Sequence, residues 1–175
     1  MDSVRWKILW KFCLFIITLL SGQGYVGCYR YSFTGASISP NVKTISIELF
    51  QNTAALVQPT LAPQFTEALR NRFITQTNLK MTVGQADLQF SGQITDYSIT
   101  PLTIQRDRAA QNRLTISVWV KFINVVEPEK SWEQVFTNFA DFSASRSLSE
   151  VEAALNAEII EKITQDIFNK ALANW

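Results

Sequence analysis

The stretch that decides the fold is residues 149–173, SEVEAALNAEIIEKITQDIFNKALA. Its apolar residues recur every fourth position, and Ala154 and Leu172 lie beside this series. That spacing predicts an amphipathic helix that buries one long stripe against a sheet and leaves its acidic residues on a solvated face. Ser149 followed by Glu152 has the pattern of a capping box, which predicts that Ser149 is the N-cap. The buried stripe is predicted to contain Val151, Leu155, Ile159, Ile163 and Ile167.

Three alternating segments upstream of this helix supply the strands of a sheet. They are residues 86–99, 113–126 and 131–142. Alternation of apolar and polar residues places side chains on opposite faces of a strand. In the first segment the phase slips between Ile94 and Tyr97, which predicts a β-bulge. The buried face of the middle strand is predicted to carry Leu114, Ile116, Val118, Val120 and Phe122.

The first half of the domain adds one strand and one helix. Residues 42–50 alternate as a strand, and residues 60–75 repeat apolar side chains at helical spacing, with Pro63 in the first turn, where a missing N–H is tolerated. The element order is therefore β-α-β-β-β-α. Sequential antiparallel strands with both helices on one face predict an α+β fold, a two-layer sandwich with about four strands in its sheet.

Composition restricts the possible chemistry. The chain has 175 residues, a net charge of +1, no histidine and two cysteines, Cys13 and Cys28. No Ser/His, Cys/His or four-ligand zinc arrangement can be built from these residues, so we expect no metal site. Asp87 and Asp96 are an odd number of residues apart on one strand, so they are expected on opposite faces and not as a convergent acid pair, unless the bulge between them resets the phase. The balanced charge also argues against nucleic-acid binding. We expect that the protein is not an enzyme and has no catalytic residues.

The N-terminal residues 1–27 have the layout of a secretory leader. Three cations, Arg5, Lys7 and Lys11, precede the apolar run FCLFIITLL at residues 12–20, and small residues follow. The run has nine residues, whereas a helix needs roughly 20 to cross a bilayer. A cleaved leader is the main interpretation, and an uncleaved N-terminal anchor is the alternative. The GxGxxG match at residues 22–27 lies in this leader and lacks the βαβ context that nucleotide binding requires.

Cys28 directly follows the leader and is the first residue of the predicted domain, residues 28–175. The sequence Tyr25-Val26-Gly27-Cys28 resembles the lipobox of bacterial lipoproteins, in which a small residue precedes the cysteine that is lipidated. Tyr25 stands where these proteins usually have leucine. We expect a covalent lipid on Cys28, such as palmitate, as the only added group and no other cofactor. Its acyl chains would hold the protein on a membrane. The alternative is an unmodified thiol.

A cluster of cations lies in the connection between the second and third strands. Arg106, Arg108 and Arg113 are close together in sequence, whereas acidic residues dominate after residue 126. Guanidinium groups bind phosphates through paired, charge-assisted hydrogen bonds. One interpretation of the cluster is therefore an anion-binding site, and the other is a solvated hairpin tip.

The domain resembles the LptE family of outer-membrane lipopolysaccharide-assembly lipoproteins. The resemblance covers essentially residues 28–175 and is closest to the Bacteroidetes branch. The segments that carry it are CYRYSF at 28–33, FTGASI at 33–38, SPNVKTISI at 39–47, LRNRF at 69–73 and ADLQFSG at 86–92, followed by the long hairpin and the final helix.

This resemblance implies a non-enzymatic plug. Members of the family insert into the lumen of the β-barrel translocon LptD, help it to assemble and bind lipopolysaccharide for delivery to the cell surface. A lipid on Cys28 and the absence of aspartate at Tyr29 imply the periplasmic side of the cell outer membrane, in its inner leaflet. Assigning lipopolysaccharide to Arg106, Arg108 and Arg113 rests on charge and position, since no family motif aligns there.

Two other functions remain open at this stage. The first is a periplasm-facing lipoprotein carrier that holds a small apolar ligand between helices and sheet. A pocket lined by Phe65, Phe136 and Phe139 would favour this function. The second is a structural lipoprotein of another envelope machine, which would share the anchor and differ in its partner. A filled core with a polar outer surface would favour the plug over the carrier.

Overall fold

The computed structural model of this protein describes residues 38–56, 58–102 and 110–172. The chain divides into two compact units, residues 1–33 and 34–175, and all described residues belong to the second unit. The predictions for the leader, for Cys28, and for Arg106 and Arg108 therefore lie outside the described residues.

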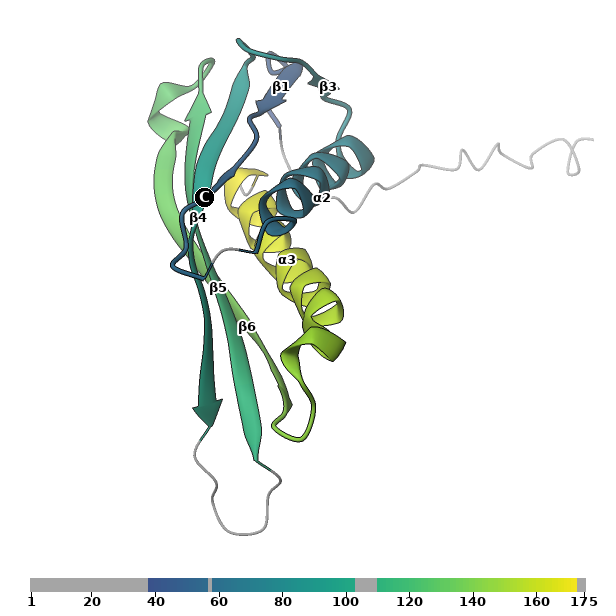
Figure 1. Cartoon of the computed structure of the whole chain (residues 1–175). Helices are drawn as coiled ribbons and strands as arrows, with labels where there is room; N and C mark the ends of the chain where they lie inside the picture. The colour runs from purple at the N-terminus through teal and green to yellow at the C-terminus, as the bar shows by residue number, and fades with distance from the viewer. Residues whose placement is uncertain (1–37, 57, 103–109, 173–175) are drawn as a thin grey trace, which may run out of the picture. The chain divides into compact units, whose positions relative to one another are not determined.

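The described chain forms one sheet with two helices on the same face (Figure 1). The helices are α2 (Leu61–Gln76) and α3 (Leu148–Leu172), and a short 3₁₀ turn covers Pro128–Lys130. The strand order is β3-β1-β4-β5-β6, with β2 paired to β4. The strands are β1 (Thr44–Ile47), β2 (Gln51–Asn52), β3 (Lys80–Met81), β4 (Leu88–Leu102), β5 (Gln111–Asn124) and β6 (Trp132–Ser143).

This arrangement confirms the two-layer α+β sandwich but corrects the prediction of antiparallel pairing throughout. The sheet has six strands, because the two-residue strands β2 and β3 add to the four predicted ones. β1 runs parallel to both β3 and β4. Parallel neighbours need a crossover connection, and α2 supplies it between β1 and β3. Because α2 connects β1 to β3, these two strands run parallel, whereas strands joined directly by short turns would pair antiparallel.

The antiparallel strands β4, β5 and β6 form the larger half of the sheet. The register of β4 shifts between Ile94 and Asp96, which confirms the predicted bulge. All five apolar side chains predicted for the buried face of β5 are at most 2% exposed. Tyr97, directly after the bulge, is buried as well because the extra residue resets the alternation.

Aromatic rings connect the two layers of the core. Phe90 of β4 lies between Phe73 of α2 and Phe122 of β5, with ring centroids 5.1 and 4.7 Å away. Phe73 also contacts Phe168 of α3 at 5.1 Å, so both helices and the sheet share one aromatic cluster. The predicted apolar stripe of α3 is buried along its whole length. The core between helices and sheet is therefore filled with side chains.

The start of α3 differs from the prediction. The helix begins at Leu148, so Ser149 lies in its first turn, where its hydroxyl hydrogen-bonds with that of Ser147 at 3.1 Å. Glu152 does not complete a capping box, because its carboxylate accepts a hydrogen bond from the Tyr97 hydroxyl at 2.7 Å. Burial, and then this hydrogen bond, raise the pKa of Tyr97. The Glu152 side chain, which the sequence pattern predicted as part of the helix cap, thus contacts Tyr97 of β4 instead.

A buried arginine joins the two helices. Arg72 of α2 is 7% exposed, and its guanidinium donates to the Thr164 hydroxyl at 3.2 Å and to the Glu161 carbonyl at 3.3 Å. The Glu161 carboxylate lies 2.5 Å from the same group, and the Gln165 side chain accepts a further hydrogen bond. A buried charge is tolerated when it is paired and hydrogen-bonded in this way.

Replacing Arg72 with methionine is expected to lower the free energy of unfolding by about 2 kcal/mol. The change removes charge-assisted hydrogen bonds but keeps most of the apolar stem. Thr164 keeps a partner in the Glu161 carbonyl, so no buried hydroxyl is orphaned. Urea denaturation measures the effect. Lys170→Met, at an exposed position of α3, is the matched control and should change stability by less than about 0.5 kcal/mol. Equal effects in the two variants would contradict a clamping role for Arg72.

Candidate functional site

The candidate site is the face of the sheet that the helices leave uncovered. Both α2 and α3 lie on one side of the sheet (Figure 1), and buried and less buried residues alternate along β5. Directly opposite residues of antiparallel strands share a face. The register therefore defines an open face formed by Gln89, Ser91, Gln93, Asp96, Ser98 and Thr100 of β4, Arg113, Thr115, Ser117, Trp119, Lys121 and Ile123 of β5, and Glu133, Val135, Thr137, Phe139 and Asp141 of β6.

Cross-strand ion pairs neutralise most charges of the open face. Lys121 lies 2.9 Å from Glu133. The Arg113 guanidinium donates twice to Asp141, at 2.7 and 2.9 Å, and stacks 3.6 Å from the ring centre of Phe139. The hydrogen bonds from Arg113 lower the pKa of Asp141, and those to Asp141 raise the pKa of Arg113. The remaining positions are mainly Ser, Thr and Gln, so this face offers uncharged hydrogen-bonding groups.

Apolar side chains interrupt this polar surface. Gln93, Trp119 and Val135 form one row across β4, β5 and β6. Val135 is 52% exposed and Phe139 is 42% exposed, while Trp119 is half-buried between them and β4. Exposed aromatic and aliphatic groups inside a polar surface are typical of protein contact sites.

The predicted anion-binding arginines are only partly described. Arg113 lies near the hairpin end of β5, where Asp141 occupies its Nε and one terminal nitrogen. Arg106 and Arg108 lie outside the described residues. The assignment of lipopolysaccharide to these three residues stays a prediction, and the structure adds that Arg113 already has an ionic partner.

The pocket predicted for a carrier is not formed by its three phenylalanines. Phe65 is fully buried in the core, and Phe136 contacts Trp132 on the helix side of the sheet. Phe139 lies on the open face, since it pairs with Thr115. Phe136 and Phe139 are three residues apart on one strand, and an odd spacing puts side chains on opposite faces. These three residues therefore do not line one pocket, and the observation that would favour the carrier is not made.

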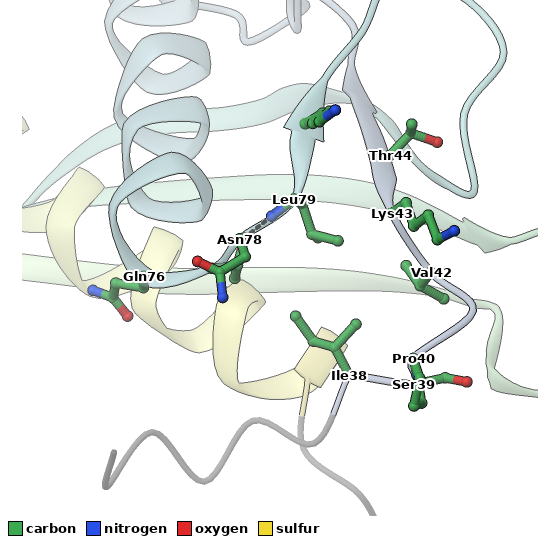
Figure 2. Close-up of a pocket in the computed structure, with 11 residues that line it drawn as sticks. Ile38, Ser39, Pro40, Val42, Lys43, Thr44, Gln76, Asn78 and Leu79 are labelled. Atoms are coloured by element: carbon green, nitrogen blue, oxygen red, sulfur yellow. Dashed lines mark hydrogen bonds between the residues drawn. The ribbon is translucent and has the colours of Figure 1, made fainter. Parts of the chain in front are cut away.

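Two surface cavities flank β3 at the other end of the sheet. The larger, about 640 Å³, is lined by residues of the segment before β1, of β1 and of the loop from α2 to β3. Figure 2 shows Ile38, Val42 and Leu79 around it, with Asn78 and Gln76 at the end of α2. The second, about 530 Å³, lies beside Leu49, Arg70 and Val83. Neither is lined by an aromatic residue. The second is lined by two acids, Glu48 and Glu67, and Glu67 is paired with Arg70 at 2.6 Å.

Asp87 bonds to two residues that line the larger cavity, Lys43 and Thr44. The Asp87 carboxylate accepts hydrogen bonds from the backbone N–H groups of Lys43 and Thr44, at 2.8 and 2.9 Å, and from the Thr44 hydroxyl at 2.9 Å. These bonds, the one from Lys43 first, hold the pKa of Asp87 below its usual value. Asp87 thus ties the beginning of β4 to β1.

This network predicts a pH dependence of stability. Because the pKa of Asp87 is lower in the folded state, its contribution is present above the unfolded pKa of 3.8 and is lost as pH falls through the folded value. As pH falls below about 4, the unfolding free energy should therefore decrease more steeply in the wild type than in Asp87→Asn. Denaturation at a series of pH values measures both slopes. Parallel curves would contradict the network, and Asp96→Asn serves as a control on the same strand.

The described part of the chain contains no grouped metal ligands. In residues 38–56, 58–102 and 110–172 no three His, Cys, Asp or Glu side chains are grouped as metal ligands. None of the helices in these ranges has the length and apolar character to cross a membrane. Asp87 bonds to β1, while Asp96 accepts a hydrogen bond from Ser98 on the open face. The expectation that the protein is not an enzyme stays a prediction.

The fold and the open face define a class of protein: a small α+β module whose helices back one side of a sheet and whose other side is covered by no other helix or strand of the described residues. The model of the LptE family, described as lipopolysaccharide-assembly, matches residues 42–171. The chain belongs to the LptE family. This finding confirms the resemblance seen in the sequence.

Two solved structures with TM-scores above 0.5 share the fold at low sequence identity. A minor lipoprotein from Acinetobacter baumannii is 13% identical, with a TM-score of 0.51, over 76% of this chain and 94% of its own. A protein from Xanthomonas campestris is 10% identical, with a TM-score of 0.51, over 76% and 88%. A rare lipoprotein B from Shewanella oneidensis is 12% identical, with a TM-score of 0.44, over 73% and 90%. No protein of curated function matches the sequence.

Proposed function

We propose that this protein is a lipid-anchored subunit that fits into the lumen of an LptD-type β-barrel, helps it to assemble and binds lipopolysaccharide for delivery to the surface. The observation that carries this proposal is membership of the LptE family over residues 42–171. The filled core and the polar, largely neutral open face support it, because the interior of a large outer-membrane barrel is polar. The carrier lacks its predicted pocket and is the weaker alternative.

The proposed lipid anchor would determine the location of this subunit in the cell. A lipid on Cys28 would tie the chain to the inner leaflet of the outer membrane, on the periplasmic side. Ten residue steps separate Cys28 from Ile38, where the described domain begins. A fully extended chain spans at most about 3.5 Å per residue, so the domain would lie within about 35 Å of the bilayer. That reach is compatible with a barrel in the same membrane. Mass spectrometry of the mature N-terminus tests the anchor, and an unacylated intact leader would contradict it.

Affinity purification from detergent extracts tests the partner. A tagged wild-type chain should bring down a large β-barrel protein in amounts comparable to its own. The same chain with Cys28→Ser, if it is still exported, reports whether the lipid is needed for the partner to be found. A wild-type preparation without any barrel protein would contradict the proposed function.

Lipopolysaccharide binding is assigned to Arg106, Arg108 and Arg113. Replacing Arg106 and Arg108 together with glutamate is expected to weaken binding of lipopolysaccharide about tenfold or more, since charge-assisted contacts to phosphate are each worth about 1.5–3 kcal/mol. Equilibrium binding to purified lipopolysaccharide measures the change. Lys130→Glu with Lys170→Glu alters the net charge equally and should leave the affinity within about twofold. Unchanged binding in the arginine variant would remove these residues from the site.

A further inference from the structure

The two outer surfaces of the described domain differ in charge. The exposed positions of α3 include Glu150, Glu158, Glu161, Lys162, Asp166 and Lys170, so this surface is charged and net acidic. On both surfaces many charges are paired: Glu158 with Lys162 on α3, and the two cations of the open face with Glu133 and Asp141. The open face differs in its middle, where Gln93, Trp119 and Val135 form a row without charge. Depletion of charged residues, together with aromatic residues, distinguishes the centre of a protein contact surface from the solvated remainder.

The two edges of the sheet are less accessible to a strand of another chain than the open face is to a partner surface. Lys162 of α3 donates to the carbonyl of Phe139 on the outer edge of β6, at 3.3 Å. Arg70 of α2 donates to the carbonyl of Ile47 beyond the end of β3, at 2.7 Å. Cations placed on edge carbonyls oppose the addition of a strand from another chain. A second copy, or any partner that pairs with an edge, is therefore disfavoured relative to one that covers the open face.

The chemistry of the open face fits one kind of partner. Eight of its 17 residues are Ser, Thr or Gln, which can donate and accept hydrogen bonds without bringing charge. The hydroxyls of Ser117 and Thr137, which bond to each other at 2.8 Å, lie between the apolar row of Trp119 and the Arg113–Asp141 pair. A polar β-sheet wall, such as the inner surface of a wide barrel, presents matching groups in the same strand-like spacing.

We propose that the open face, centred on Trp119, Val135 and Phe139, is the surface through which this protein contacts the inner wall of the barrel subunit. This inference rests on the proposed function and assigns a surface to it. The exposed helix surfaces then face the aqueous lumen or the periplasm.

Charge substitutions on the two surfaces test the proposal. Val135→Arg with Thr137→Arg places two cations on the open face at exposed positions, and Ala153→Arg with Ala157→Arg does so on the exposed side of α3. Unpaired charges in a closed contact cost several kcal/mol, so the barrel co-purified per tagged chain should fall at least tenfold in the first variant. It should stay within about twofold in the second. Thermal unfolding of both variants checks that the fold is kept.

Site-specific photocrosslinking in the otherwise wild-type chain gives a second readout that does not depend on the stability of the arginine variants. A crosslinker at Val135 should capture the barrel protein, and one at Ala157 should not. If the wild type brings down the barrel but both arginine variants do so equally, or only Ala157 crosslinks, the open face is not the contact and the proposed function still stands. If the wild type brings down no barrel, the proposed function itself has failed.

Discussion

Replacing Phe90 with alanine is expected to lower the free energy of unfolding by about 3–5 kcal/mol. Phe90 is fully buried and lies between the rings of Phe73 and Phe122, at 5.1 and 4.7 Å. Truncation removes these contacts and leaves a cavity where β4, β5 and α2 meet. A protein of this size has a total stability of about 5–15 kcal/mol, so the variant should be marginal at 37 °C.

The matched control is Phe139→Ala on the open face. Phe139 is 42% exposed and contacts Arg113, so the same chemical change there should cost only about 1 kcal/mol. Urea denaturation followed by circular dichroism measures both variants. Effects of similar size would mean that the open face and the buried face of the sheet have been assigned incorrectly.

Adding a single methyl group at Gly92 is expected to lower the free energy of unfolding by about 3 kcal/mol. A Cβ atom at this position would meet the carbonyl oxygen of Trp119 on β5 and would lie 2.5 Å from Cε1 of the Phe50 ring. The first neighbour is backbone of the adjacent strand and cannot move without disturbing the ladder. Glycine at this position therefore allows a close approach of backbone and ring.

Ser91→Ala, one residue earlier on the same strand, is the control for Gly92→Ala. Ser91 belongs to the open face, so the loss of its hydroxyl should change stability by less than about 0.5 kcal/mol. Thermal or urea unfolding of both variants measures their stabilities and so tests the two predictions. A Gly92→Ala variant as stable as the wild type would show that β4 and β5 are farther apart than the structure places them.

Elements with strong local periodicity were predictable from sequence. The two helices, the three long strands, the bulge after Ile94 and the buried face of β5 follow from the spacing of apolar residues, and the structure confirms them. Features set by contacts between distant segments were missed. The parallel pairing of β1, the two-residue strands and the capture of Glu152 by Tyr97 depend on tertiary structure, which overrides local pattern.

Two further features of the structure were predictable from the spacing of residues in the sequence. The spacing of three residues between Phe136 and Phe139 on a strand already excludes a shared pocket. Arg72 stands three residues after Leu69 and one before Phe73, so it lies next to the buried stripe of α2 and needs partners on a neighbouring helix. The open face was predictable as a polar strand face, whereas its ion pairs required the register of β5 and β6.

The most direct measurement is the mass of the complex that the tagged wild-type chain forms in detergent. A plug fills the lumen of one barrel, so native mass spectrometry should find one copy of this chain with one large β-barrel subunit, and bound lipopolysaccharide on part of that population. A chain that elutes by itself, or in several copies without any barrel, would contradict the account.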